Sequence, residues 1–115
     1  MKVAISATGN TLSASVDRVF GRCAWFLFVD SETMECEALE NKNAEAASGA
    51  GTSCAQLVME REVDAVISGQ VGPNAYEALK LGEVKIFIAP QDSSIREAIE
   101  KCKHNELQQM QMKVF

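Results

Sequence analysis

The stretch Val63–Gly82, VDAVISGQVGPNAYEALKLG, decides the fold, since it predicts a buried strand, a glycine turn and a helix in succession. Its first residues are apolar and rich in β-branched side chains, which is typical of a strand covered on both faces in a parallel sheet. We expect Gly72 to cap the helix, Pro73 to occupy its first position and Gly82 to end it at the C′ position. Such a turn leaves backbone N–H groups free at the helix start, where ligands of open α/β sheets bind.

The residues on the N-terminal side of this stretch predict three strands, Lys2–Ala7, Ala24–Asp30 and Met34–Leu39. The third strand alternates in polarity, so we expect it to run antiparallel to the second and to be half exposed. The polar segment Thr8–Arg22 is long for a plain connection and is expected to wrap over one edge of the sheet. A helix is then expected from Gly49–Gly51 to about Arg61. Thr52 or Ser53 is the expected cap of that helix.

The residues after the stretch predict a fifth strand, Val84–Ala89, and a last helix that begins at Asp92 or Ser93. The apolar positions of this helix keep the i, i+3, i+4, i+7 spacing of one buried face: Ile95, Ala98, Ile99 and Cys102. The tail from His104 leaves three alternatives open, because it could prolong the helix, add an edge strand at Met112–Phe115, or fray.

The order of these elements favours a single α/β domain over residues 1–115. It indicates a ribonuclease H-like three-layer fold, a mixed five-stranded sheet with helices on both faces. If the first, third, fourth and fifth strands run parallel, their C-terminal ends share one edge. Four loops then meet at that edge, namely Thr8–Arg22, Asn41–Ser53, Gly69–Gly72 and Ala89–Ser93. The start of the antiparallel second strand brings Arg22 and Cys23 to the same edge.

The composition narrows the class of function. A net charge of −5, from 11 basic and 16 acidic side chains, argues against nucleic-acid binding, which needs a basic face. No signal-peptide pattern or apolar run of membrane-spanning length is present, so we expect a cytoplasmic protein with no membrane partner. His104 is the sole histidine, which leaves no Ser–His or Cys–His catalytic pair elsewhere. The first strand, Lys2–Ala7, lacks the carboxylates of two-metal nucleases. We therefore expect a protein that is not an enzyme.

The four cysteines are Cys23, Cys36, Cys54 and Cys102. They are spread through the chain with no Cys-x-x-Cys pair, so neither a disulfide scaffold nor a structural zinc site is expected. Cys23 could ligate a soft metal as a thiolate, but the residues alone favour a small buried thiol. Cys54 lies in the first turn of its helix, where the dipole lowers a thiol pKa, although its apolar neighbours favour a core role. Cys36 and Cys102 are expected to be structural.

Two glycine loops and an arginine form the candidate binding site. The loop Gly49-Ala50-Gly51-Thr52-Ser53 offers backbone N–H groups and hydroxyls at a helix start, which suits an anion. The loop Gly69-Gln70-Val71-Gly72-Pro73-Asn74 allows close approach of a ligand and offers side-chain amides. For each loop the alternative of a tight turn without a ligand stays open. Arg22 could pair with a phosphate, a carboxylate or an anionic cluster.

The chain resembles the dinitrogenase iron-molybdenum cofactor biosynthesis family over nearly its whole length. Four segments carry the resemblance, namely KVAIS, VFGRCAWFLFVD, GAGTSCAQLV and VDAVISGQVGPNAYEALKLGEVKIFIA. The resemblance implies a ribonuclease H-like fold and a binding or carrier role for iron–sulfur precursors or the finished nitrogenase cofactor. Cofactor-handling members carry a histidine just before the Phe-Gly pair, where this chain has Val19, so the chain looks closer to small stand-alone members. By analogy the site residues are Phe20, Gly21, Arg22, Cys23, Gly49, Gly51, Thr52, Ser53, Gly69, Gly72, Pro73 and Asn74.

Two functions follow as expectations. The first is a non-catalytic carrier, related to nitrogen fixation, of an anionic iron–sulfur or iron–molybdenum type metallocluster or its precursor. The cluster would be bound cargo, with Cys23 as its thiolate ligand. The alternative is a metal-free module that binds a small anionic metabolite or nucleotide. Cluster-donor or cluster-acceptor proteins are the expected protein partners, and a monomer is the expected state. A third function, an enzyme with a reactive Cys54 or Cys23, is disfavoured because no histidine partner is available.

Overall fold

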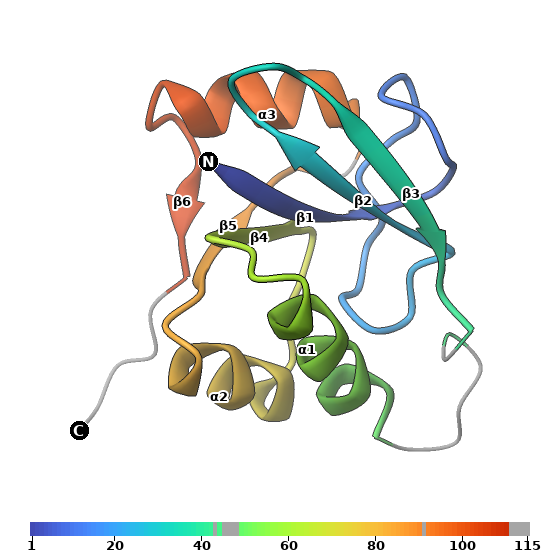
Figure 1. Cartoon of the computed structure of the whole chain (residues 1–115), viewed down its shortest axis with the longest axis vertical. Coiled ribbons are helices and arrows are strands. Elements are labelled where there is room, and N and C mark those ends of the chain that lie inside the picture. Colours follow the sequence, from blue (N-terminus) through green and yellow to red (C-terminus); the bar gives the residue numbers. More distant parts are fainter. Residues whose placement is uncertain (43, 45–48, 91, 111–115) are drawn as a thin grey trace.

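The computed structural model describes residues 1–42, 44, 49–90 and 92–110, in which one mixed sheet carries helices on both sides (Figure 1). The strands are β1 (Lys2–Ala7), β2 (Trp25–Asp30), β3 (Cys36–Glu40), β4 (Ala65–Ser68), β5 (Lys85–Ile88) and β6 (Gln108–Gln109). Their order in the sheet is β3-β2-β1-β4-β5-β6.

The prediction of five strands is wrong, because the tail adds β6, which pairs antiparallel with β5. The chain reverses after the last helix at Asn105, whose φ of 57° is in the left-handed region that asparagine tolerates. Beyond the paired residues, the N–H of Met110 donates to the carbonyl of Ile86 at 2.7 Å. The tail therefore does form an edge strand, but earlier than Met112–Phe115, which lie outside the described residues.

The strand directions confirm the predicted parity. β1 pairs in parallel with β4, and β4 in parallel with β5, whereas β2 runs antiparallel to both β1 and β3. The C-terminal ends of β1, β3, β4 and β5 consequently face one edge of the sheet, at the right-hand side of the view in Figure 1. We call this edge the glycine rim, after the glycine loops that follow β3 and β4.

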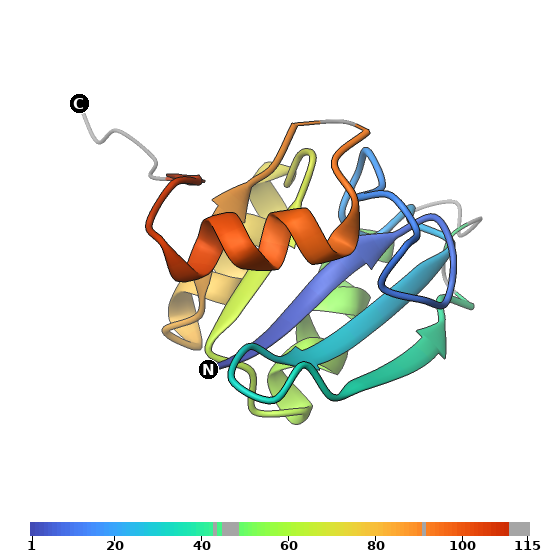
Figure 2. The ribbon, with the colours of Figure 1, turned by 90° about the horizontal axis from the view of Figure 1, so that it is seen from above.

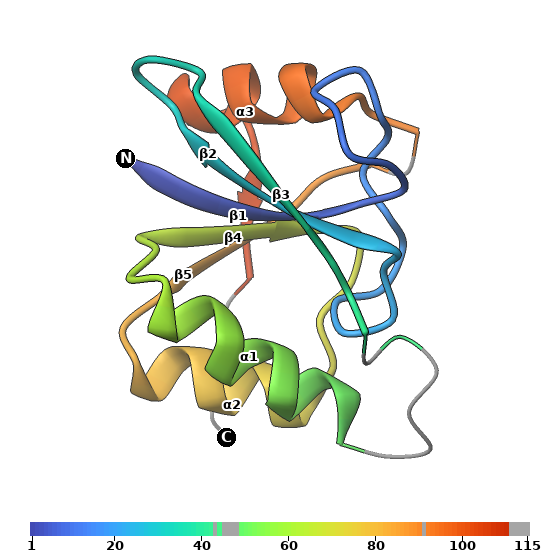
Figure 3. The ribbon, with the colours of Figure 1, turned by 45° about the vertical axis from the view of Figure 1, so that its right-hand side comes forward.

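In the described part of the chain, three helices cover the two faces of the sheet. α1 (Ala50–Glu60) and α2 (Pro73–Leu81) pack on one face over a core that includes Phe26, Phe28 and Val66. α3 (Ile95–Lys103) packs on the other face (Figures 2 and 3). The predicted apolar face of α3 is confirmed, since all four of its members are buried: Ile95, Ala98, Ile99 and Cys102.

The helix ends differ from the predictions in three places. α3 is capped by Ser94 rather than Asp92 or Ser93, because Ser94 forms a capping box with Glu97. The cap of α1 is Gly49, with a φ of 76° and no side-chain hydrogen bond, so Thr52 and Ser53 are exposed helical residues instead of caps.

The end of α2 is the third difference. Gly82 is its C-cap with a φ of −85°, and the left-handed residue is Glu83, with a φ of 60°. A Cβ on Gly82 would overlap the sulfur of Met59 in α1, so that flexible side chain would have to move to accept a larger residue. The start of α2 follows the prediction, with Gly72 at the N-cap and Pro73 in the first turn.

The edge strand β3 is more exposed than predicted. Cys36, Glu37, Ala38 and Glu40 are all exposed, and Leu39 is half-buried. The expectation that Cys36 is structural is therefore wrong: it lies on an edge strand that its neighbours leave open to solvent. Among the residues that the structure describes, no helix combines the length and apolar character that crossing a bilayer requires.

Candidate functional site at the glycine rim

The loops at the glycine rim are tied together by backbone hydrogen bonds. The N–H of Phe20 donates to the carbonyl of Gln70 at 2.8 Å, and the N–H of Gly69 donates to the carbonyl of Asp17 at 3.1 Å. The N–H of Val16 donates to the carbonyl of Ser93 at 2.8 Å. The segment between β1 and β2 thus wraps over the edge as expected and contacts the loops that follow β4 and β5.

The starts of α1 and α2 lie side by side beneath the turn Phe20–Cys23. A Cβ on Gly51, in the first turn of α1, would lie 3.2 Å from the Cβ of Ala75 in the first turn of α2. A Cβ on Gly21 would lie 2.9 Å from both the nitrogen and the Cα of Gly51. Gly21 also has a φ of 95°, which glycine adopts at low cost. The absence of side chains on Gly21 and Gly51 therefore lets the turn, α1 and α2 pack closely together.

Both helix starts favour a negative charge. The N-caps of α1 and α2 are Gly49 and Gly72, and neither helix has a side-chain cap or an acidic residue in its first turn. The partial positive charge of two adjacent helix starts is therefore left to other groups to balance. The two helix starts therefore give the rim a partly positive surface that suits an anion.

Arg22 adds a formal positive charge at the same place. It is exposed, and its guanidinium donates to the carbonyl of Ala44 at 3.1 Å, which links the turn Phe20–Cys23 to the loop after β3. A guanidinium is suited to charge-assisted hydrogen bonds with oxygen or sulfide on an anion. Arg22 is therefore a candidate side chain for contact with cargo at the rim.

The predicted site residues divide by exposure. Six are exposed, namely Arg22, Gly49, Thr52, Ser53, Pro73 and Asn74, and three are half-buried, namely Gly51, Gly69 and Gly72. Phe20, Gly21 and Cys23 are buried and lie under the rim. Phe20 packs edge-on against Phe26, with ring centroids 5.4 Å apart, and so anchors the turn in the core. The structure brings the glycine loops and the turn together, while their ligand-binding role stays a prediction.

Packing alone explains why position 69 is a glycine. A Cβ at this position would lie 2.7 Å from the carbonyl oxygen of Arg18, so the segment between β1 and β2 can cross the end of β4 only over glycine. This contact supplies the alternative interpretation of the second loop, a turn that needs glycine for its own geometry.

Cys23 is fully buried, and burial raises the pKa of its thiol to about 12. It is therefore a protonated thiol at neutral pH. Ligation of cargo at the rim by Cys23 requires the turn Phe20–Cys23 to move outward, and its role as a ligand stays a prediction. Within the described residues no group of three or more His, Cys, Asp or Glu side chains is arranged to hold a metal ion.

Asn41 is the residue that the sequence analysis missed. It is 6% exposed, and its Nδ2 donates to the carbonyls of Gly21 at 3.0 Å and Cys23 at 2.9 Å. Its Oδ1 accepts from the thiol of Cys54 at 3.5 Å. Asn41 thus joins the end of β3 to the turn and to α1. Its position directly after a strand that ends at the loop-bearing edge is the signal that could have indicated it.

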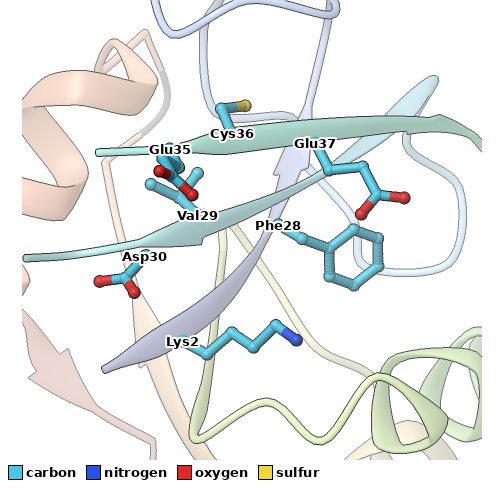
Figure 4. Close-up of a pocket in the computed structure, with 7 residues that line it drawn as sticks. All are labelled: Lys2, Phe28, Val29, Asp30, Glu35, Cys36 and Glu37. Carbon is cyan, nitrogen blue, oxygen red and sulfur yellow. The ribbon is translucent and has the colours of Figure 1, made fainter. Parts of the chain in front are cut away.

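Pockets lie at both ends of the sheet. A pocket of ≈ 570 Å³ opens at the rim between Trp25, Glu40, Asn41 and Lys42. A pocket of ≈ 390 Å³ lies at the opposite end, between Lys2 on β1, Asp30 on β2 and Glu37 on β3 (Figure 4).

The pocket in Figure 4 is already engaged by the chain itself. Its Glu37 accepts a hydrogen bond from Arg61 at 2.8 Å, and the Arg61 guanidinium lies 4.7 Å from the centroid of the Phe28 ring. Its Asp30 accepts the N–H groups of Glu32 and Thr33, which lower the pKa of that carboxyl. We therefore place the candidate site at the glycine rim.

Comparison with known proteins gives consistent matches over nearly the whole chain. The family profile described as "Dinitrogenase iron-molybdenum cofactor" matches residues 1–105. An uncharacterized protein of Methanocaldococcus jannaschii is 32% identical over 114 residues, which cover 96% of this chain and 92% of that protein.

Two solved structures are also similar. The apo form of the orange protein from Desulfovibrio gigas is 29% identical, with a TM-score of 0.90, and the match covers 95% of this chain and 92% of that one. A Thermotoga protein of the DUF35 family, proposed to be a NifB protein, is 30% identical with a TM-score of 0.83, and the match covers 99% and 97% of the two chains.

Proposed function

Because the chain belongs to the dinitrogenase iron-molybdenum cofactor family, we propose that it is a non-catalytic carrier of an anionic metallocluster of the iron–sulfur or iron–molybdenum type, or of a precursor of one. Family membership supports a cofactor-binding or carrier role. That the cargo is an anionic cluster, and that the protein does not catalyse a reaction, are proposals that go beyond family membership. The cluster is cargo, and it is held at the glycine rim.

The observation that carries the proposal is the meeting of two uncapped helix starts under Gly21, with Arg22 beside them. Backbone N–H groups and a guanidinium suit a polyanion whose surface atoms are oxygen or sulfide, since both accept hydrogen bonds. The exposed Thr52 and Asn74 lie in the first turns of the two helices and add further polar groups. The residues present therefore fit a negatively charged cluster held mainly by hydrogen bonds and charge.

The descriptions of the solved relatives support the proposed carrier function. The orange protein was described in an apo form, a term that implies a form with something bound, and the Thermotoga relative is proposed to be a NifB protein. Extending these descriptions to the present chain gives cluster-handling proteins as its partners. We also propose that the protein is monomeric and cytoplasmic. Its single domain over residues 1–115 would have the ribonuclease H-like fold.

The test is anaerobic reconstitution with ferrous iron and sulfide, with and without molybdate, followed by gel filtration, metal analysis and absorption spectroscopy. We expect wild type to retain about one cluster per chain and Arg22→Ala to lose most of it. Arg18→Ala is the matched control, since Arg18 is an exposed arginine on the same segment. Equal retention by wild type and Arg22→Ala would contradict binding at the rim. Equal retention by wild type and Cys23→Ala would exclude Cys23 as a ligand while leaving the rim in place.

A metal-free module for a small anionic metabolite or nucleotide is the second candidate. It is favoured by Val19, which stands where cofactor-handling members carry histidine, and by the burial of Cys23. This function predicts that phosphate compounds raise the melting temperature of wild type and not that of Arg22→Ala. A cluster retained through gel filtration, together with no thermal shift from a panel of phosphate compounds, would reject it.

A further inference from the structure

Beneath the glycine rim lies a closed group of polar side chains, which we call the thiol pocket: Ser6, Cys23, Asn41 and Cys54. All four are buried, and the exposed fractions of Ser6, Cys23 and Cys54 are 0%. The thiol pocket sits between the end of β1, the turn Phe20–Cys23 and the first turns of α1. The thiol pocket therefore lies beneath the surface at which the proposed function places the cluster.

The two thiols lie at the two ends of one carboxamide. Asn41 Nδ2 lies 3.9 Å from the sulfur of Cys23, and Asn41 Oδ1 lies 3.5 Å from the sulfur of Cys54. The sulfur of Cys54 is also 3.9 Å from the carbonyl oxygen of Gly21. The two thiols are close enough that a charge on Cys54 contributes to the raised pKa of Cys23, a smaller effect than burial. Two sulfur atoms from separate elements are thus directed at a single small group.

Ser6 supplies an independent observation. Its hydroxyl oxygen is fully buried and makes no hydrogen bond of good geometry with the described residues. The same hydroxyl faces Cys23 closely enough to lower the pKa of that thiol, a smaller effect than the rise due to burial. A buried polar atom without a well-placed partner costs about 1–3 kcal/mol, so the Ser6 hydroxyl beside the Cys23 thiol would gain from an anionic acceptor.

We propose that Cys23 and Cys54 form a two-thiolate site for a single soft metal ion of low coordination number, of which Cu(I) is the biological example. Soft thiolates select Cu(I), whereas structural zinc takes four ligands, and the thiol pocket offers two sulfur atoms. The ion binds between the two sulfur atoms, the Asn41 carboxamide swings aside, and the Ser6 hydroxyl gains an anionic sulfur to which it can donate.

The reaction balances without a redox step. One M⁺ ion and two thiols give one bis-thiolate complex of charge −1 and release two protons. Because burial raises the pKa of Cys23 to about 12, the Cys23 proton stays on sulfur at neutral pH until the ion displaces it. The negative product lies at the start of α1, since Cys54 is the fifth residue of that helix, and the helix dipole stabilises it.

The pocket of ≈ 570 Å³ at the rim provides the route of entry. Asn41 lines this pocket, together with Trp25, Glu40 and Lys42, and the Asn41 carboxamide contacts both thiols. Rotation of this one side chain would connect the open pocket with the thiol pocket. An ion therefore reaches the sulfur atoms without unfolding of the turn Phe20–Cys23.

The site is tested by titrating Ag(I) and Cu(I) into Cys36→Ser protein, which lacks the exposed thiol, anaerobically and without sulfide. Metal-to-thiolate absorption and the release of protons into a weak buffer are measured together. We expect saturation at one ion and two protons per chain. Adding Cys54→Ser should lower the affinity at least tenfold. Adding Cys102→Ser, which removes a buried thiol on α3, should leave the affinity unchanged.

Near-ultraviolet circular dichroism checks that each variant folds. If Cys54→Ser does not fold, X-ray absorption of Cu(I)-loaded Cys36→Ser protein decides, and two sulfur neighbours with no nitrogen are expected. Fewer than two protons per ion, a single sulfur neighbour, or unchanged uptake in Cys54→Ser would overturn the proposal. Cluster retention at the rim depends on Arg22 instead of Cys54, so either proposal can fail while the other stands.

Discussion

Replacing Asn41 with alanine removes the side chain that fastens the turn Phe20–Cys23 to the body of the protein. The backbone carbonyls of Gly21 and Cys23 each lose a donor, and the thiol of Cys54 loses its acceptor. A buried carbonyl left without its donor costs about 1–3 kcal/mol. Water entering from the pocket that Asn41 lines would recover part of this energy. We therefore expect the free energy of unfolding to fall by about 2–4 kcal/mol.

The assay is urea denaturation monitored by circular dichroism, with Asn10→Ala as the control. Asn10 is exposed in the segment Thr8–Arg22, and its replacement should change stability by less than about 0.5 kcal/mol. A loss below about 1 kcal/mol in Asn41→Ala would contradict the anchoring role of Asn41, because it would mean that the two carbonyls find other donors.

Asn41→Asp provides a second, pH-dependent check of the same contacts. The new carboxyl keeps the shape of the amide but, once ionised, places negative oxygen against the carbonyls of Gly21 and Cys23. Burial and these carbonyls would raise its pKa above the unfolded value of about 3.9. Stability is then retained below that value and lost as the pH rises through the folded-state pKa. We expect the variant to be more stable relative to wild type at pH 4 than at pH 7.

Three further predictions concern single contacts. Gly21→Ala should lower the free energy of unfolding by about 2–4 kcal/mol, since its Cβ would overlap Gly51 and its φ is positive. Gly72→Ala is the control, because a Cβ at Gly72 meets open space, and it should cost less than about 0.5 kcal/mol in the same denaturation assay. Because the pKa of Cys23 is raised to about 12 in the folded protein, the unfolded chain loses the thiol proton at lower pH. The free energy of unfolding should therefore decline between about pH 9 and pH 12. Melting curves at alkaline pH should show a flatter decline for Cys23→Ala. Ser94→Ala should cost about 1 kcal/mol through loss of the capping box, measured against Ser93→Ala.

The sequence predicts most of the fold because its strongest signals are local. The apolar runs of β1 and β4, and the spacing of apolar residues in α3, depend on neighbours along the chain, and strand parity then fixes which loops share an edge. β6 escaped prediction because two glutamines carry no strand signal and pair only where β5 leaves an edge open. The exposure of Cys36 was not predicted, because it depends on β3 being the edge strand of the sheet, and no local sequence pattern indicates which strand lies at the edge.

The site was predicted in outline and missed in its interior for a related reason. Glycine and a helix start can be recognised one at a time, so the loops Gly49–Ser53 and Gly69–Asn74 were found. Asn41 matters only through partners 13 and 18–20 residues away in the sequence, in Cys54, Cys23 and Gly21. Such a network exists only in the folded chain, and an isolated asparagine after a strand is common in turns.

The turn Phe20–Cys23 links the two proposals physically. Arg22 in this turn is exposed to solvent, and Cys23 in the same turn is buried in the thiol pocket. An ion that draws the Cys23 sulfur toward Cys54 would displace the Asn41 carboxamide and weaken its hold on the carbonyl of Gly21. The position of the Arg22 guanidinium would then depend on whether the thiol pocket is filled. Measuring cluster retention with and without bound Ag(I) therefore tests a coupling between the two sites, and equal retention would show that they act independently.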